Sequence, residues 1–235
     1  MYSNPQISGK IALVGGDEFT AECESMDRAL LDMLSLSKPR ITVIPTAASH
    51  ENPGKAALNG ISYFSNLGAD VTQLMVLNDS EANDEKFLQP IENTDVIYFT
   101  GGDPKYLLKI LSGSLFLKKV LEAISNGIYI IGSSAGAMVL GTYMWHNKWS
   151  KCLGIVKNVA VLPHHENAHP ALIYEKFSKY VNQDLILLGI DSKTCAVKGT
   201  DKWEILGNGG IIIYTKDGWE KFESGQSLPM DTTTY

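Results

Sequence analysis

The sequence predicts an α/β protein, a three-layer sandwich with a mostly parallel central sheet between helices and a C-terminal antiparallel β extension. Two observations carry this prediction. Up to Gly189, short apolar runs alternate with segments of helical spacing, which is typical of parallel strands buried on both faces. Beyond that point, short β-favouring runs are separated by Gly, Asn and Asp turns, which indicates an antiparallel meander.

The expected elements follow this pattern along the chain. Apolar runs bounded by glycine or proline are interpreted as strands, and apolar residues three and four positions apart as helices. Strands are expected at 10–14, 41–44, 71–77, 95–99, 128–131, 159–162, 185–189, 195–198, 203–206 and 211–214. Helices are expected at about 26–34, at 56–67, near Phe87, at 107–111, at 115–124, from 135 and at 171–181, with an irregular loop at 142–151 and a loose polar tail from 224.

No linker, internal repeat or low-complexity segment interrupts this pattern. We therefore expect residues 1–235 to form a single domain, with its core at about 10–215. The net charge is −6 and no basic run occurs, so nucleic acid is not an expected partner. No apolar run approaches the roughly 18 residues that a membrane-spanning helix needs, and the N-terminus lacks the apolar core of a signal peptide.

The three cysteines are scattered along the chain, at Cys23, Cys152 and Cys195, and no C-x-x-C occurs. This spacing predicts neither a disulfide framework nor a zinc ribbon. We expect a cytoplasmic protein without a metal or a cofactor, and we consider a homodimer as its assembly.

The stretch most indicative of chemistry is Gly132-x-Ser134-x-Gly136, directly after the apolar run at 128–131. Glycines at these positions permit a tight strand-to-helix turn that lifts the Ser134 hydroxyl out of the sheet. A helix that begins at Ala135 would point free N–H groups at whatever Ser134 attacks. The stretch therefore predicts a nucleophilic serine; the alternative is a glycine-rich turn with no chemistry.

A nucleophilic serine needs a base, and the base usually needs an acid that orients it. His164 is the best-placed histidine because it follows the strand expected at 159–162. No Asp or Glu occurs between Ala135 and Pro163, so the candidates for the acid are Glu166, which we prefer, and Asp191.

An oxyanion hole requires backbone N–H donors near the serine. The N–H of Ala135 is one donor by geometry, and the Gly101-Gly102 pair after the strand at 95–99 is a source of the second. The candidate substrate-binding residues are Asp103 and His165, although a polar surface residue is the simpler interpretation of His165.

Two other kinds of motif do not predict a function for this chain. Gly15-Gly16-Asp17-Glu18-Phe19 spells the signature of diguanylate cyclases, but it lies too near the N-terminus for that domain to precede it and it closes a strand of a parallel pattern. No phosphate-loop or dinucleotide fingerprint occurs either.

These motifs together resemble the aspartyl dipeptidase (dipeptidase E) and cyanophycinase family of serine peptidases, which shares its fold with class I glutamine amidotransferases. The resemblance covers about residues 10–215 and is most specific at Tyr98–Asp103 and Gly132–Ala137. It implies Ser134 as the nucleophile, His164 as the base, and the N–H groups of Gly102 and Ala135 as the oxyanion donors.

The chain departs from the family at three places. The dipeptidase branch has an aspartate some fifteen residues after the serine, where this chain has the acid-free stretch 145–150. The cyanophycinase-like branch has an acid directly after the Asp of G-I-D, where this chain has Ser192. The substrate-binding arginines that follow the histidine are replaced by residues 165–169, and His164-x-Glu166 instead resembles the H-x-E of the amidotransferases, in which Glu orients His.

The predicted function is a serine-type hydrolase of small peptides or related amide bonds, acting through an acyl-enzyme on Ser134. The missing acid and arginines motivate an alternative, a non-catalytic binding or regulatory protein on the same scaffold. A large separation between Ser134 and His164 would favour that alternative. A glutaminase-like hydrolase is the third hypothesis, but such sites usually have Cys where this chain has Ser134.

Overall fold

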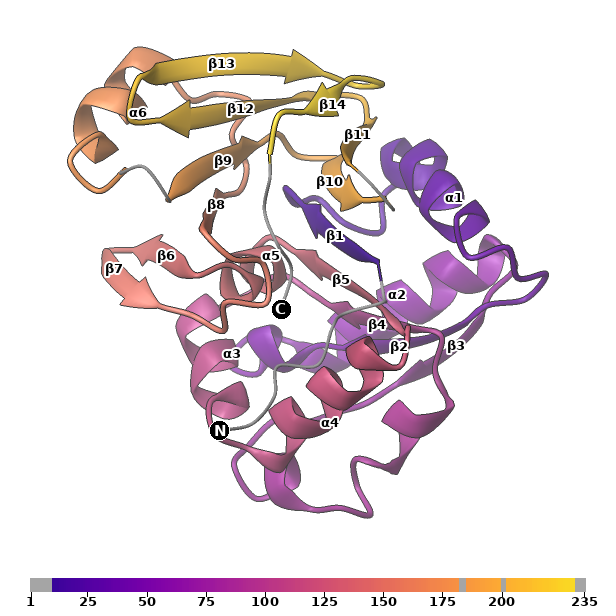
Figure 1. Ribbon diagram of the computed structural model, residues 1–235. Coiled ribbons are helices and arrows are strands. Elements are labelled where there is room, and N and C mark those ends of the chain that lie inside the picture. The colour runs from indigo at the N-terminus through magenta and orange to yellow at the C-terminus, as the bar shows by residue number, and fades with distance from the viewer. Residues whose placement is uncertain (1–9, 182–184, 200–201, 231–235) are drawn as a thin grey trace.

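The computed structural model describes residues 10–181, 185–199 and 202–230. Its largest sheet has eight strands: β1 (Ile11–Val14), β2 (Arg40–Ile44), β3 (Asp70–Gln73), β4 (Val96–Phe99), β5 (Tyr129–Ser133), β10 (Thr194–Lys198), β11 (Trp203–Gly207) and β14 (Ser227–Leu228). The strand order is β14-β11-β10-β1-β5-β4-β2-β3 (Figure 1). The strands from β1 to β3 in this order are parallel, and β10, β11 and β14 continue the sheet with antiparallel pairing.

The parallel strands are buried on both faces. In β1, Ile11 and Leu13 belong to the hydrophobic cluster on one face, and Ala12 and Val14 belong to the cluster on the other. All four residues of β1 and all four of β4 are buried. This double burial explains why these strands are unbroken apolar runs in the sequence.

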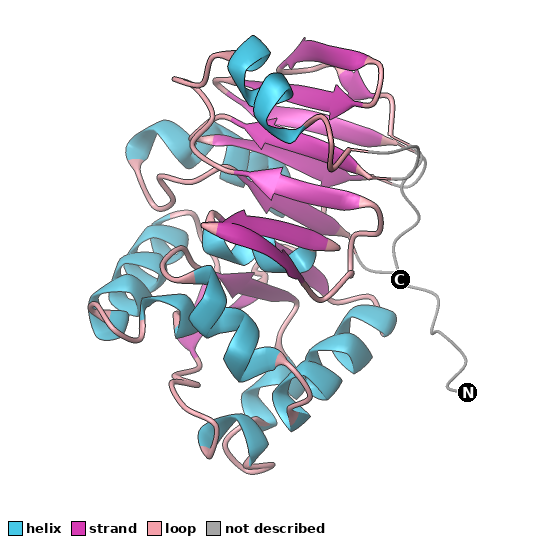
Figure 2. Cartoon of the chain, turned by 90° about the vertical axis from the view of Figure 1, so that its left-hand side faces the viewer, coloured by secondary structure: helices cyan, strands magenta, loops and turns pink. Residues whose placement is uncertain are grey.

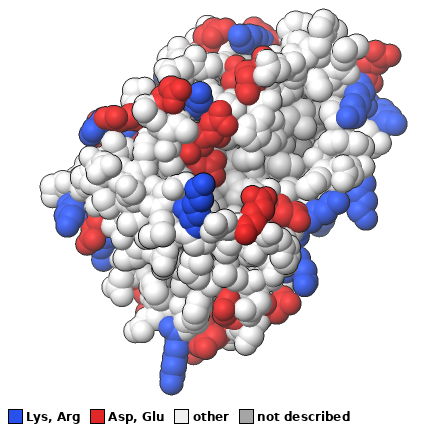
Figure 3. All heavy atoms as spheres, turned by 180° about the vertical axis from the view of Figure 1, so that it is seen from behind, with Lys and Arg blue, Asp and Glu red and all other residues white. Residues whose placement is uncertain are grey.

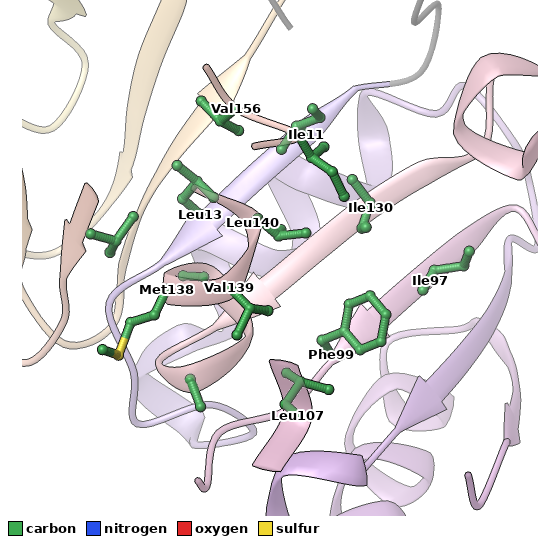
Figure 4. Packing of buried hydrophobic residues seen from close by; sticks show 14 of the residues in the cluster. Ile11, Leu13, Ile97, Phe99, Leu107, Ile130, Met138, Val139, Leu140 and Val156 are labelled. Carbon is green, nitrogen blue, oxygen red and sulfur yellow. The ribbon is translucent and has the colours of Figure 1, made fainter. Parts of the chain in front are cut away.

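Helices cover both faces of the parallel strands. One face packs against α1 (Glu24–Asp32) and α2 (Pro53–Asn66), and the other against α3 (Pro104–Leu111), α4 (Leu115–Ser125) and α5 (Ala135–Leu140). Figure 2 shows the helices gathered around the strands in the lower part of the molecule, and Figure 4 shows core side chains from the strands and α5 packed together. The predicted α/β sandwich with a mostly parallel central sheet is confirmed.

A second sheet of four strands carries much of the C-terminal half. Its strands are β8 (Val159–Leu162), β9 (Ile186–Ile190), β12 (Gly210–Thr215) and β13 (Gly218–Glu223), in the order β13-β12-β9-β8. Strands β8 and β9 are parallel, whereas β12 is antiparallel to both of its neighbours. The helix α6 (Pro170–Phe177) lies beside this sheet at the upper left of Figure 1.

The C-terminal strands are antiparallel as predicted, but a single meander is wrong. Strands β10 and β11 belong to the large sheet, while β12 and β13 belong to the small one. The chain changes sheet at Asn208-Gly209, where the Gly209 N–H donates to Thr194 Oγ1 at 2.9 Å. Thr194 lies 15 residues earlier in the chain, so the local sequence pattern could not indicate this contact.

The stretch at 142–151 is a β-hairpin and not the predicted irregular loop. Strands β6 (Tyr143–His146) and β7 (Lys148–Lys151) pair around Asn147, whose φ of 65° suits a tight turn. Trp145 lies opposite Trp149, with ring centroids 5.8 Å apart. Such cross-strand aromatic pairs stabilise hairpins.

Three smaller expectations are also wrong. Strand β3 ends at Gln73, because it is an edge strand whose pairing with β2 stops there. Short 3₁₀ turns at Glu81–Asn83 and Gln89–Asn93 replace the helix near Phe87. In the tail, β14 pairs with β11 and its Leu228 is buried; residues 231–235 lie outside the described residues.

Asp27 of α1 is a buried acid in the layer between α1 and α2. Its Oδ2 accepts a hydrogen bond from Tyr63 at 2.8 Å, and its Oδ1 has no partner among the described residues. Burial raises the pKa of the Asp27 carboxyl to about 7. The folded protein therefore holds a proton on Asp27 at pH values where the unfolded chain has released it.

We expect the free energy of unfolding to fall as pH rises from about 4 to about 7, by roughly 1.4 kcal/mol for each unit that separates the folded and unfolded pKa values of Asp27. Asp27→Asn should remove this slope and stabilise the protein at pH 8, since the amide stays neutral. Urea unfolding at pH 5 and pH 8 measures the effect, with the exposed Asp32→Asn on the same helix as the control. Equal slopes for the wild type and Asp27→Asn would contradict the assignment.

Acidic side chains gather across the middle of the face in Figure 3, with basic side chains among and around them. Across the described ranges, every helix is too short or too polar to cross a membrane.

Candidate active site

Ser134 lies at the sharp turn between β5 and α5. Its backbone has φ 47° and ψ −107°, a combination that residues other than glycine rarely adopt. The strand and helix approach so closely that a Cβ on Gly132 would lie 2.5 Å from the backbone carbon of Gly136. The structure therefore has the nucleophile elbow that the sequence predicts, with the strain held by packed elements on both sides.

His164 faces Ser134 from the segment that follows β8. His164 Nε2 lies 3.1 Å from Ser134 Oγ, which is within hydrogen-bond range. The backbone N–H of His164 donates to Gly15 O at 2.9 Å. The loop after β1 thus fixes the histidine beside the serine, and the large and small sheets each supply one residue of the pair.

The other ring nitrogen of His164 contacts a residue that the sequence analysis did not assign. His164 Nδ1 lies 3.0 Å from Ser192 Oγ. Ser192 in turn donates both its groups to Glu166: its O–H reaches Oε1 at 3.1 Å and its N–H reaches Oε2 at 2.8 Å. Direct orientation of His164 by Glu166 is therefore wrong, since one hydroxyl stands between the carboxylate and the ring.

This chain of contacts selects one tautomer of His164. Because the Ser192 hydroxyl donates its proton to Glu166, its oxygen is free to accept a hydrogen bond from His164 Nδ1–H. The lone pair of Nε2 then faces Ser134 Oγ, which is the form that a general base requires. Burial raises the pKa of the Glu166 carboxyl, but the hydrogen bonds from Ser192 and the nearby His164 outweigh it and hold that pKa below its usual value.

The alternative acid, Asp191, is engaged elsewhere. Asp191 Oδ2 accepts the Gly210 N–H at 2.9 Å and so fixes the start of β12. A second carboxylate, that of Asp17, lies 4.0 Å from His164 Nδ1, beyond hydrogen-bond range, and equally far from Lys193 Nζ. Neither aspartate takes the place of Ser192.

The two predicted oxyanion donors lie at the same edge of the sheet. Ala135 is the first residue of α5, so its N–H is one of the unpaired donors at the helix N-terminus. Gly102 is exposed with φ 135°, and a Cβ there would lie 2.4 Å from the Ala47 backbone. Only glycine fits this position, and the role of its N–H as an oxyanion donor stays a prediction.

Glu18 is a further polar residue of the site that sequence reasoning missed. Its Oε1 accepts the Gly101 N–H at 2.7 Å, and its Oε2 accepts the Ser133 hydroxyl at 2.7 Å. One carboxylate from the loop after β1 therefore joins the loop after β4 to the end of β5, next to the nucleophile. The sequence offered one signal for it, the acidic pair Asp17-Glu18 that follows Gly15-Gly16 at a strand end.

We expect Glu18→Ala to lower the free energy of unfolding by about 3 kcal/mol, because two donors, one on the fully buried Ser133, lose a charged acceptor. Urea unfolding checks this value. Glu22→Ala, in the 3₁₀ turn Ala21–Cys23 that follows this loop, is the control, since solvent screens the exposed Glu22–Lys193 pair and its loss should change stability far less. Equal effects of the two variants would show that Glu18 is not a structural link.

The predicted substrate-binding residues have structural contacts. Asp103 caps α3, with its Oδ1 accepting the N–H groups of Lys105 and Tyr106 at 2.8 and 3.2 Å. His165 is buried, and its Nε2 lies 2.7 Å from Tyr214 Oη. Burial lowers the pKa of the His165 imidazole, so the neutral form is favoured. Substrate binding by either residue stays a prediction.

An open pocket of about 440 Å³ begins at His164 and extends between α6 and the β6–β7 hairpin. Apolar side chains dominate its lining, among them Met138 of α5, Trp145 of β6 and Phe177 of α6. The two arginines of the chain lie outside it: Arg28 pairs with Glu24 on α1, and Arg40 pairs with Asp95. Among the described residues, no group of three or more His, Cys, Asp or Glu could hold a metal ion.

Comparisons with known proteins agree with this geometry. The family "Peptidase family S51" matches residues 11–204, which is most of the chain. The chain belongs to peptidase family S51. Members of this family are serine hydrolases of peptide or amide bonds, so the predicted reaction class and the predicted relationship to dipeptidase E and cyanophycinase are confirmed.

Individual S51 relatives are distant in sequence. A cyanophycinase of Trichormus variabilis is 25% identical over 223 residues, which cover 86% of this chain and 72% of that protein. A cyanophycinase of Geminocystis herdmanii is 28% identical over 189 residues, 74% of this chain and 68% of that protein. The crystal structure of a peptidase from an acI-B1 actinobacterium has a TM-score of 0.80 at 28% identity and covers 98% of this chain and 100% of its own.

The structure of a putative peptidase E from Listeria monocytogenes supports the fold alone. It has a TM-score of 0.64 at 20% identity and covers 86% of this chain and 99% of its own.

Proposed function

We propose that this chain hydrolyses the amide bond of short peptides through an acyl-enzyme on Ser134. The observation that carries the proposal is the 3.1 Å contact between Ser134 Oγ and His164 Nε2 at a strained elbow. The non-catalytic alternative expects these two atoms to lie beyond hydrogen-bond reach, so this distance argues against it.

The reaction follows the order of contacts. Ser134 Oγ attacks the carbonyl carbon while His164 Nε2 takes the hydroxyl proton. The N–H groups of Gly102 and Ala135 hold the negative charge that develops on the carbonyl oxygen. His164 then gives its proton to the leaving amine, and the acyl-enzyme remains. In the second half of the reaction His164 takes a proton from the attacking water and returns it to Ser134 Oγ as the acid product leaves.

Glu166 acts on this cycle through Ser192. Its carboxylate keeps the Ser192 hydroxyl turned so that Ser192 Oγ accepts from His164 Nδ1–H. When His164 takes the serine proton, the ring becomes an imidazolium, and the negative charge of Glu166 stabilises it. Ser192 and Glu166 are therefore positioning residues, and neither touches the reacting atoms.

A fluorophosphonate probe tests the proposal, because it modifies an activated serine covalently. We expect the wild-type chain to be labelled and peptide mapping by mass spectrometry to place the adduct on Ser134. Ser134→Ala should abolish labelling, while Ser37→Ala, in an exposed loop far along the chain from the site, should not change it. An adduct on another residue, or no labelling of a folded wild-type chain, would overturn the proposal.

A further inference from the structure

We propose that the pocket beside His164 binds a bulky apolar or aromatic side chain of the substrate residue next to the scissile amide. This inference rests on the proposed function and adds the substrate class to it. The pocket has a volume of about 440 Å³, and its lining includes Pro163 and His164, the residue that contacts Ser134 Oγ. A substrate whose carbonyl carbon lies at Ser134 can therefore place the side chain of a residue beside the scissile bond in the pocket.

Apolar side chains form most of the pocket wall, among them Met138 of α5, Trp145 of β6, Leu162 of β8, and Ile173 and Phe177 of α6. The polar side chains that line it are His146, His164, His165 and Lys176. In Figure 4 the Met138 side chain extends from α5 away from Ile97 and Phe99 of the core. Trp145 packs against Phe177 with ring centroids 5.2 Å apart, which gives the pocket an aromatic wall. An apolar ligand group is the class that such a lining favours.

The charges around the pocket disfavour an acidic side chain inside it. Lys176 is the one Lys or Arg that lines it, and no Asp or Glu is among the described lining residues. The Lys176 ammonium is exposed and lies 5.1 Å from the Trp145 ring centroid and 4.9 Å from the Phe177 ring centroid. These contacts hold the cation against the aromatic wall. A carboxylate placed deeper, among the apolar side chains, would lose its hydration without a guanidinium to replace it.

Four dipeptides test the inference without assuming on which side of the scissile bond the pocket lies: Phe-Ala, Ala-Phe, Asp-Ala and Ala-Asp. We expect kcat/KM for the better phenylalanine peptide to exceed that of both aspartate peptides by about tenfold or more. Ile173→Arg should remove this preference, whereas Leu172→Arg should keep it, because Leu172 is the neighbouring residue on α6, is 62% exposed and does not line the pocket. Ala168→Trp, which fills the pocket from another wall, provides a second variant should Ile173→Arg fold poorly.

Binding of the same dipeptides to the Ser134→Ala chain separates this inference from the proposed function. Tighter calorimetric binding of a phenylalanine peptide than of either aspartate peptide, lost in Ser134→Ala/Ala168→Trp, supports the pocket assignment even if no peptide is hydrolysed. Preferred binding or turnover of an aspartate peptide, particularly if it depends on Lys176, would overturn it. If none of the four peptides binds, the pocket assignment is overturned as well, whereas labelling of Ser134 would still support the proposed serine hydrolase.

Discussion

His164→Ala should lower kcat for a peptide substrate by at least about 10⁴-fold and leave KM almost unchanged. The reason is geometric. His164 Nε2 is the ring nitrogen that contacts Ser134 Oγ, and the hydroxyl is a weak nucleophile at neutral pH until a base removes its proton. The imidazole contributes to the transition state far more than to ground-state binding, so the loss should fall on kcat.

His169→Ala is the matched control for this variant. His169 is an exposed histidine five positions further along the chain, it precedes α6, and no contact joins it to Ser134. We expect its kcat to stay within about threefold of the wild type, since surface substitutions have small effects. Steady-state kinetics and the rate of fluorophosphonate labelling should agree. A His164→Ala chain that retains a tenth of the wild-type kcat would show that another group is the base.

The sequence predicts the Ser134–His164 pair because both residues follow strands. The elbow has a local signature, and His164 is the first residue beyond Pro163 at the end of β8. Functional side chains of α/β proteins gather at the carboxyl ends of strands, and the structure brings the ends of β5 and β8 together although the two strands belong to different sheets. The apolar strands of the large sheet were predictable for a related reason, since burial on both faces leaves an unbroken apolar run.

No local motif marks Ser192 as a bridge; the sequence indicates only that Ser192 stands where the cyanophycinase-like branch has an acid. Ser192 lies 26 positions from Glu166 and 28 from His164, and it reaches both through the packing of the loop after β9 against the segment after β8. From the sequence we looked for an acid that contacts the histidine directly, as in a catalytic triad, and so named Glu166 and Asp191 as candidates. We did not look for a hydroxyl between the acid and the histidine. The hairpin at 142–151 was missed for a different reason. Each of its strands has only four residues, and the mixture of tryptophans and lysines does not form a clear alternation of apolar and polar residues.

Glu166→Gln should reverse the hydrogen-bond directions around His164 and lower kcat by about 10² to 10⁴, the upper value being that of a triad whose histidine is held in the wrong tautomer. The Ser192 N–H requires an oxygen acceptor, so the glutamine amide nitrogen would face Ser192 Oγ. The hydroxyl can then no longer donate to residue 166, and its proton turns toward His164 Nδ1. The ring would carry its proton on Nε2, facing Ser134, where it cannot accept another.

The tautomer itself can be observed by ¹⁵N NMR of histidine-labelled protein, which distinguishes a protonated Nδ1 from a protonated Nε2 without reference to activity. Asp17→Asn is the matched control, because it removes a carboxylate 4.0 Å from the same ring nitrogen but leaves the Ser192 bridge intact; we expect less than about a threefold change in kcat. The double variant Ser192→Asp/Glu166→Gln should recover at least tenfold of the lost kcat, since the new carboxylate can accept from Nδ1–H directly while the glutamine amide donates to it. If Glu166→Gln leaves both the tautomer and kcat unchanged, Glu166 does not set the direction of the Ser192 hydroxyl, and the bridge does not determine the tautomer of His164.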